Sequence, residues 1–224
     1  MDESQIERTL VACEQALAAA GTPDLRALGF WRAVGAVKRR SELVPRYATR
    51  IAAIDRQTFR RRVRLAFPVT LGVIALDVAL FGGLLLLAIA IGVPHPWREL
   101  FVLAATGAID VAVHGLAHLA VGTLAGIGFT DWFVSLPKPP GFKIDYASYL
   151  RTPPQQRAWM HASGAIASKL TPFLVIPYAV AIDTDTWAVL ALLALGVVQI
   201  VTDLLYSVRA SDWKKFRREM RLSR

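Results

Sequence analysis

The segment that decides the fold is ELFVLAATGAIDVAVHGLAHLAVGTL, residues 99–124, which is mostly apolar over more than the roughly 20 residues that a helix needs to cross a bilayer. Three other segments, at about 66–93, 159–182 and 186–208, are similarly long and apolar. Each run therefore predicts a membrane-spanning helix. We expect an all-α membrane protein with four transmembrane helices.

The overall composition agrees with this fold class. Of the 224 residues, 54% are hydrophobic, and 26 Lys and Arg against 17 Asp and Glu give a formal net charge of +9. The basic residues cluster before the first span and at the C-terminus, where they suit anionic lipid headgroups better than a DNA groove. We therefore expect membrane lipids, and no nucleic acid, as partners. The single cysteine, Cys13, excludes an internal disulfide.

The distribution of positive charge predicts the orientation of the spans, because Lys and Arg collect in cytoplasmic loops. The region before the first span, the 125–158 loop and the C-terminal end are basic, whereas the 182–186 loop, IDTDT, carries no positive residue. Both termini should therefore be cytoplasmic. We expect an integral protein of a bacterial-type inner (plasma) membrane.

The chain divides into three parts. Residues 1–65 form a cytoplasmic or interfacial region, in which the amphipathic helical stretch at 28–64 either lies along the inner membrane surface or is solvated. Residues 66–208 form the transmembrane domain, and residues 209–224 form a basic cytoplasmic tail. The proline-containing 128–158 connection is not expected to be helical, and FKIDYASYL within it is either a short strand or an interfacial loop.

Ionisable residues inside the spans are costly to insert, so each is a candidate for function. Two of them, His114 and His118, lie four residues apart and therefore point from the same face of a helix. The others are Asp77, Asp110, His161, Lys169 and Asp203. Lys169 is expected to neutralise Asp77 or Asp110 in an ion pair. His161 is either a further ligand or proton carrier, or an interfacial histidine.

A third polar residue, Asp203, is expected at a membrane depth similar to that of the two histidines. At about 1.5 Å of rise per residue, His118 lies roughly 9 Å and His114 roughly 15 Å from the cytoplasmic end of the second span, and Asp203 lies roughly 8 Å from that of the fourth. Two imidazoles and a carboxylate from another helix form a three-ligand zinc site with one position open for water. The sequence therefore predicts zinc bound by His114, His118 and Asp203. The alternative is that both histidines hydrogen-bond to neighbouring helices.

The order of these motifs resembles the site-2 protease family of intramembrane zinc metalloproteases. HGLAH, residues 114–118, stands in place of the family's HExxH, and GAIAS, residues 164–168, stands in place of Gly-Pro-x-x-Asn. IVTDLLYS, residues 200–207, would supply the Asp that completes the zinc site. The resemblance covers about residues 99–208, and it implies a zinc metallopeptidase that cleaves transmembrane or membrane-proximal peptides.

Four departures from the family motifs leave the function open, and one of them is that Asp203 lacks the following glycine. Gly115 occupies the place of the glutamate that accepts a proton from zinc-bound water, and Ala165 and Ser168 replace the family's Pro and Asn. The chain is therefore either a zinc metalloendopeptidase without the usual base or a non-catalytic pseudoprotease that binds or regulates membrane partners. A third alternative is haem or ion handling with His118 and His161 as ligands.

Overall fold

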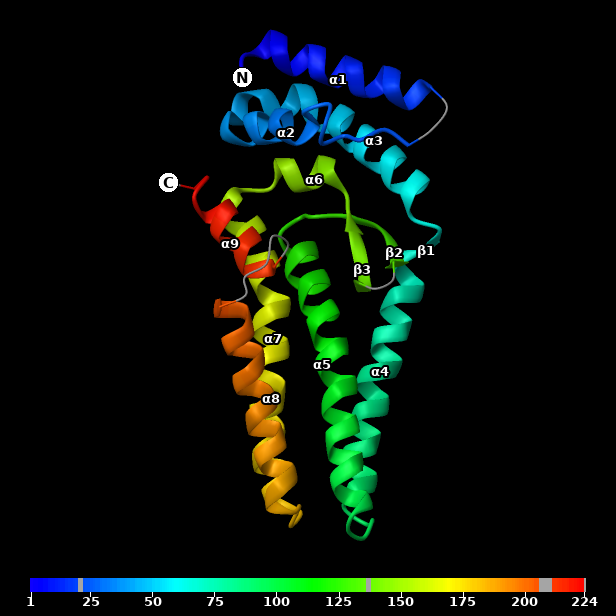
Figure 1. Cartoon of the computed structure of the whole chain (residues 1–224), viewed down its shortest axis with the longest axis vertical. Helices are drawn as coiled ribbons and strands as arrows, with labels where there is room; N and C mark the ends of the chain where they lie inside the picture. Colours follow the sequence, from blue (N-terminus) through cyan, green and yellow to red (C-terminus); the bar gives the residue numbers. More distant parts are fainter. Residues whose placement is uncertain (20–21, 136–137, 206–210, 224) are drawn as a thin grey trace.

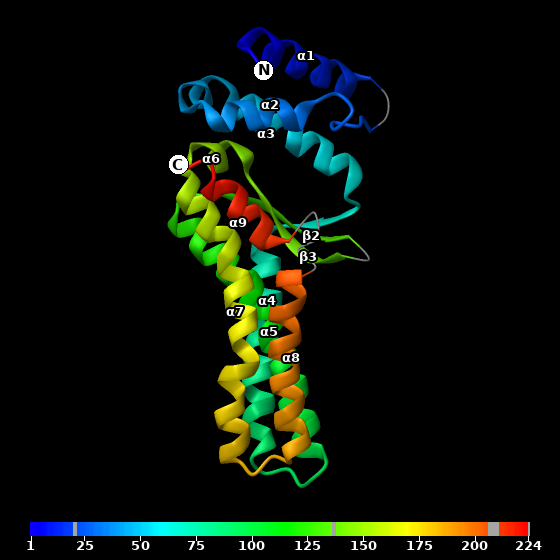
Figure 2. The ribbon, with the colours of Figure 1, turned by 60° about the vertical axis from the view of Figure 1, so that its left-hand side comes forward.

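The computed structural model describes residues 1–19, 22–135, 138–205 and 211–223. Its centre is a bundle of four long helices (Figure 1 and Figure 2), namely α4 (Val69–Ala90), α5 (Trp97–Leu124), α7 (Pro154–Ala181) and α8 (Thr186–Leu205). The other helices and strands gather at one end of this bundle, together with both termini (Figure 1). We call this the capped end, and we call the end with the α4–α5 and α7–α8 connections the open end.

All four bundle helices are long and apolar enough to cross a membrane. Large apolar side chains face outward from them: Val78 is 67% exposed and Leu174 is 72% exposed. Such a surface is costly in water but suits lipid, so it indicates a membrane protein. The prediction of four such helices is confirmed, with shifted ends. Helix α7 begins at Pro154 rather than near residue 159, because proline fits the first turn of a helix.

The N-terminal region is a layer of three helices, α1 (Glu3–Ala18), α2 (Phe30–Arg39) and α3 (Val44–Arg62). A capping box of Asp2 and Gln5 starts α1. The apolar faces of the three helices share one core, which includes Ile6, Leu10, Phe30, Val37, Tyr47 and Ile51. The amphipathic stretch at 28–64 therefore buries its apolar face within the protein rather than offering it to a membrane surface, because α1 supplies an apolar partner.

A small antiparallel sheet lies between this layer and the bundle and corrects the all-α prediction. Its order is β1-β2-β3, with β1 (Leu65–Phe67) following α3 and β2 (Phe129–Ser135) pairing with β3 (Lys138–Ile144). The two consecutive prolines of the 128–158 connection disfavour a helix and lie in β3, an edge strand, where proline is tolerated. The segment FKIDYASYL begins in this strand, but it continues into a short helix, α6 (Tyr146–Arg151), which corrects the prediction that this connection has no helix. The Asp145 side chain caps this helix by accepting a hydrogen bond from the Ser148 N–H.

The C-terminal segment, expected as a basic tail, contains a helix, α9 (Asp212–Met220). The Ser211 side chain caps this helix by accepting a hydrogen bond from the Lys214 N–H. Trp159 of α7 packs edge-on against Phe216 of α9, with ring centroids 5.5 Å apart. The segment folds back as a helix because its aromatic side chains find a surface on α7. This packing brings the start of α9 to the last turns of α5.

Candidate metal centre

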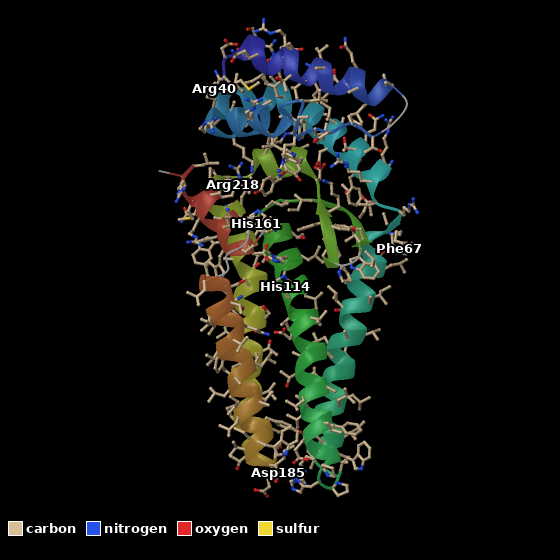
Figure 3. The ribbon with its side chains drawn as sticks, in the orientation of Figure 1. Arg40, Phe67, His114, His161, Asp185 and Arg218 are labelled. Carbon is tan, nitrogen blue, oxygen red and sulfur yellow. The ribbon has the colours of Figure 1, made fainter. Side chains whose placement is uncertain are left out.

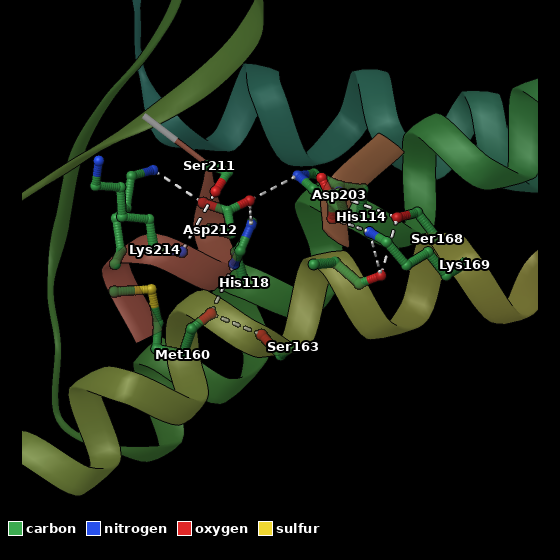
Figure 4. Close-up of polar contacts among 12 residues, drawn as sticks. His114, His118, Met160, Ser163, Ser168, Lys169, Asp203, Ser211, Asp212 and Lys214 are labelled. Carbon is green, nitrogen blue, oxygen red and sulfur yellow. Dashed lines mark hydrogen bonds and ion pairs between the residues drawn. The ribbon is translucent and has the colours of Figure 1, made fainter. Parts of the chain in front are cut away.

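Two histidines on α5 and one aspartate on α9 converge near the capped end of the bundle (Figure 4). The rings of His114 and His118 have centroids 4.7 Å apart. The Asp212 Oδ2 atom lies 3.2 Å from the His118 Nε2 atom and 3.6 Å from the His114 Nε2 atom. One ligand atom of each residue lies within 4.8 Å of the others. Two imidazole nitrogens and a carboxylate oxygen are a donor set that zinc accepts.

The structure brings together the two histidines that the sequence predicts as ligands, but it gives Asp203 another partner. The Asp203 carboxylate forms an ion pair with the Lys169 Nζ atom, and Asp212 contacts the imidazoles instead. Sequence reasoning missed Asp212 because the depth estimate considered only residues inside the apolar segments. One local signal was available, since Ser-Asp directly before an amphipathic stretch is typical of a helix N-terminus.

A backbone carbonyl fixes the orientation of His118. Its Nδ1 atom lies 2.6 Å from the Met160 carbonyl oxygen, which can only accept, so Nδ1 carries the proton. In neutral His118 the Nε2 lone pair then faces the Asp212 carboxylate. Two acceptors at 3.2 Å require a cation between them, either a proton or a metal ion. A histidine whose Nδ1–H is held by a carbonyl while Nε2 points at the site is the usual arrangement of a metal ligand.

Asp212 is ionised in this setting. Burial by itself raises the pKa of a carboxyl group, but the contact with His118 and the nearby Lys215 ammonium together hold the pKa of Asp212 below its usual value. The Lys215 Nζ atom lies 2.8 Å from the Asp212 Oδ1 atom. The other oxygen, Oδ2, is therefore the one directed at the histidines.

Close packing of α7 against α5 holds the imidazoles in place. A Cβ atom at Gly164 would lie 2.4 Å from the His118 Nε2 atom and 2.7 Å from the His114 carbonyl oxygen. A carbonyl within a helix cannot move aside as the end of a flexible side chain can. Glycine at position 164 therefore lets α7 lie this close to α5.

We expect Gly164→Ala to lower the free energy of unfolding by about 1–3 kcal/mol, the usual cost of overpacking. The added methyl group should also displace the His118 imidazole from the candidate site. Gly107→Ala, within the bundle helix α5, is the control, since a Cβ at Gly107 meets nothing within 4 Å in the described part of the chain. Denaturant unfolding and zinc titration of both proteins check this expectation, and equal stability of the two variants would contradict the close contact.

The buried charges deeper in the bundle have partners that the sequence did not predict. Lys169 pairs with Asp203 rather than with Asp77 or Asp110. The Asp110 Oδ2 atom instead accepts a hydrogen bond from the Gln199 side chain of α8, at 3.2 Å. Both contacts cross to α8, which follows α7 directly and packs beside it (Figure 2). Membrane depth can be estimated from the sequence, but it does not show which neighbouring helix each side chain will face.

His161 has a partner away from the candidate ligands. Its Nε2 atom lies 2.9 Å from the Tyr149 hydroxyl, and both residues are buried. Burial raises the pKa of Tyr149 well above its usual value, so the hydroxyl keeps its proton and can donate it to the imidazole. His118 and His161 therefore have separate polar partners, which does not favour a haem held between them.

Gly115, the position at which the resemblance implies a missing glutamate, faces helix α4. A Cβ atom at Gly115 would lie 2.6 Å from the Leu76 Cδ1 atom. Glycine at this position lets α4 and α5 approach closely. A glutamate there would need the Leu76 side chain to move.

The fold and the site together define a class of protein: a mostly helical chain with four helices of membrane-spanning length and a candidate His-His-Asp metal centre at the capped end. In comparisons with known proteins, no family model, no curated protein and no solved structure matches this chain. The function proposed below therefore rests on the residues of the site.

Proposed function

We propose that this protein is a membrane-embedded zinc metallopeptidase of the site-2 protease type, with His114, His118 and Asp212 as zinc ligands. The observation that carries the proposal is the 3.2 Å separation between the His118 Nε2 atom and the Asp212 Oδ2 atom. With its Nδ1 proton held by the Met160 carbonyl, the His118 Nε2 atom faces the Asp212 carboxylate, and a metal ion is one of the two cations that can lie between these acceptors. Three protein ligands leave the fourth position of zinc for water.

The ligands and their neighbours fit a peptidase site. Zinc in such a site lowers the pKa of its water and polarises the carbonyl of the peptide to be cleaved. The chain itself supplies the positioning, because the Met160 carbonyl orients His118 and Lys215 holds one oxygen of Asp212. The His114 side chain is 42% exposed, so an extended peptide can reach the site. The surrounding apolar helices favour transmembrane or membrane-proximal peptides as substrates.

The proposal places the capped end in the cytoplasm of a bacterial-type cell, with the helices in its inner membrane. The last turn of α3 carries Arg60, Arg61 and Arg62, and only the short strand β1 separates it from the bundle helix α4. Positive residues beside a span favour the cytoplasmic side. A peptide cleaved at the site would then be released toward the cytoplasm.

A second candidate function is a pseudoprotease that holds the metal and binds membrane segments without cleaving them. Gly115 favours it, because glycine has no side chain that accepts a proton from water. The contact that a Cβ at this position would make with Leu76 also favours it, since α4 fills the space where a glutamate would begin.

Vesicles that contain the purified protein and a panel of single-span peptides test the proposal. Cleavage should require zinc and should be lost in the His114→Ala/His118→Ala variant, because both imidazoles are ligands. Zinc binding that depends on His114 and His118, without product above that variant, would favour the pseudoprotease. A wild-type protein that binds no zinc would contradict both candidates.

Restoring a glutamate at position 115 separates the two candidates further. Gly115→Glu alone requires the end of the Leu76 side chain to move aside, whereas Gly115→Glu with Leu76→Ala provides the space without that movement. A positioned general base raises rates by on the order of a hundredfold or more, so the double variant should cleave faster than Leu76→Ala by that factor. A folded, zinc-loaded double variant that cleaves no faster than Leu76→Ala would contradict a competent peptidase site.

A further inference from the structure

A second group of metal-ligating side chains lies at the open end of the bundle, far from His114 (Figure 3). His95 comes from the α4–α5 connection, Glu99 from the first turn of α5, and Asp185 directly precedes α8. The His95 Nδ1 atom lies 2.6 Å from the Glu99 Oε1 atom and 3.5 Å from the Asp185 Oδ2 atom. One ligand atom of each residue lies within 4.8 Å of the others.

Glu99 provides an independent sign that a cation belongs here. Its side chain is 0% exposed, and its Oε1 atom accepts a hydrogen bond from the Asp185 N–H at 3.1 Å. Its Oε2 atom is buried and has no hydrogen-bond partner within the described ranges. The carboxylate is directed into the cluster, because Oε1 contacts His95. A buried carboxylate oxygen without a partner is costly, and a bound cation removes that cost.

The backbone around the cluster is held in place before any ion binds. The Arg98 Nη1 atom donates hydrogen bonds to the carbonyl oxygens of Ile182 and Asp183, at 2.7 Å and 3.2 Å. The Thr184 N–H donates to the Ala179 carbonyl oxygen at 3.0 Å. The α7–α8 connection is therefore fixed against the start of α5, so that Asp185 faces His95 and Glu99 without a further movement of the chain.

We propose that His95, Glu99 and Asp185 form a second binding site for a divalent metal ion of the zinc class, at the open end of the bundle. One imidazole nitrogen and two carboxylate oxygens suit such an ion. The His95 and Asp185 side chains are about half exposed, which gives the ion a path from solvent and leaves a position for water. A metal there links the α4–α5 connection to the α7–α8 connection. This site is independent of the proposed peptidase function.

A zinc count in the absence of the capped-end ligands tests the second site. The full-length His114→Ala/His118→Ala protein is loaded with zinc alone, separated from free metal and assayed with a chromophoric chelator. We expect one bound equivalent in this protein, and none when His95→Ala or Glu99→Gln is added. Asp183→Asn is the matched control, because it removes the same charge two residues from Asp185 and should leave one equivalent.

These outcomes test the second site whether or not the capped-end site binds zinc. No zinc in the folded His114→Ala/His118→Ala protein would overturn the proposal, as would a count that His95→Ala leaves unchanged. If the double variant does not fold, the count is made on the wild-type protein. His95→Ala and Glu99→Gln should then each lower that count by one equivalent, and no decrease would again overturn the proposal.

Discussion

Asp212→Asn should lower the zinc affinity of the capped-end site by about 100-fold or more, because loss of residues that only orient a ligand already costs about 10- to 100-fold. Asparagine keeps the shape of the side chain but removes the charge that faces both Nε2 atoms, at 3.2 Å and 3.6 Å. The affinity is measured by competition with a chromophoric chelator. The measurement uses a His95→Ala background, so that only the capped-end site is counted.

Asp203→Asn is the matched control for this prediction. The same change is made on the neighbouring helix, but the Asp203 carboxylate pairs with Lys169, so zinc affinity should change by no more than a few-fold. The opposite ranking, with the larger loss in Asp203→Asn, would contradict the ligand set His114, His118 and Asp212. It would support the set that the sequence alone predicts.

Glu219→Ala should strongly destabilise the capped end. The Glu219 carboxylate is completely buried and contacts the Lys38 Nζ atom at 2.6 Å and the Arg157 Nε atom at 2.9 Å. Removing one member of a buried charge cluster typically costs about 3–5 kcal/mol, because the remaining charges lose their partner. Burial already lowers the pKa of Lys38 to about 8 in spite of the attraction of Glu219. Without that carboxylate, the ammonium form of Lys38 is disfavoured further.

This change should also weaken zinc binding, although Glu219 is not a ligand. Glu219 lies on the same short helix as Asp212 and fastens that helix to α2 and α7 through Lys38 and Arg157. Denaturant unfolding and the zinc titration check both effects. Glu14→Ala is the control, since it breaks a partly exposed ion pair with Arg50, a change worth about 1 kcal/mol or less. A Glu219→Ala protein as stable as the Glu14→Ala protein would contradict the anchoring role.

The bundle helices were predictable because each is a continuous apolar run of membrane-spanning length. The pairing of His114 with His118 was predictable for a similar reason, since a spacing of four residues places both on one face of a helix. Neither inference needs any knowledge of how distant segments pack. Both inferences depend only on the length and the periodicity of a single helix.

The third ligand was not predictable in this way. Asp212 reaches the histidines because α9 folds back, and that path depends on contacts between Glu219 and two residues far away in the sequence, Lys38 and Arg157. The sheet presents the same difficulty, because β1 at Leu65–Phe67 pairs with a strand more than sixty residues later. Helix periodicity and membrane depth contain no information on either contact.

The most direct test of the capped-end metal centre is the zinc content of the purified His95→Ala protein beside that of His95→Ala/His114→Ala/His118→Ala. We expect one equivalent of zinc in the first protein and none in the second, with both proteins folded. No zinc in the first protein, or the same content in both, would contradict a metal centre formed by His114, His118 and Asp212.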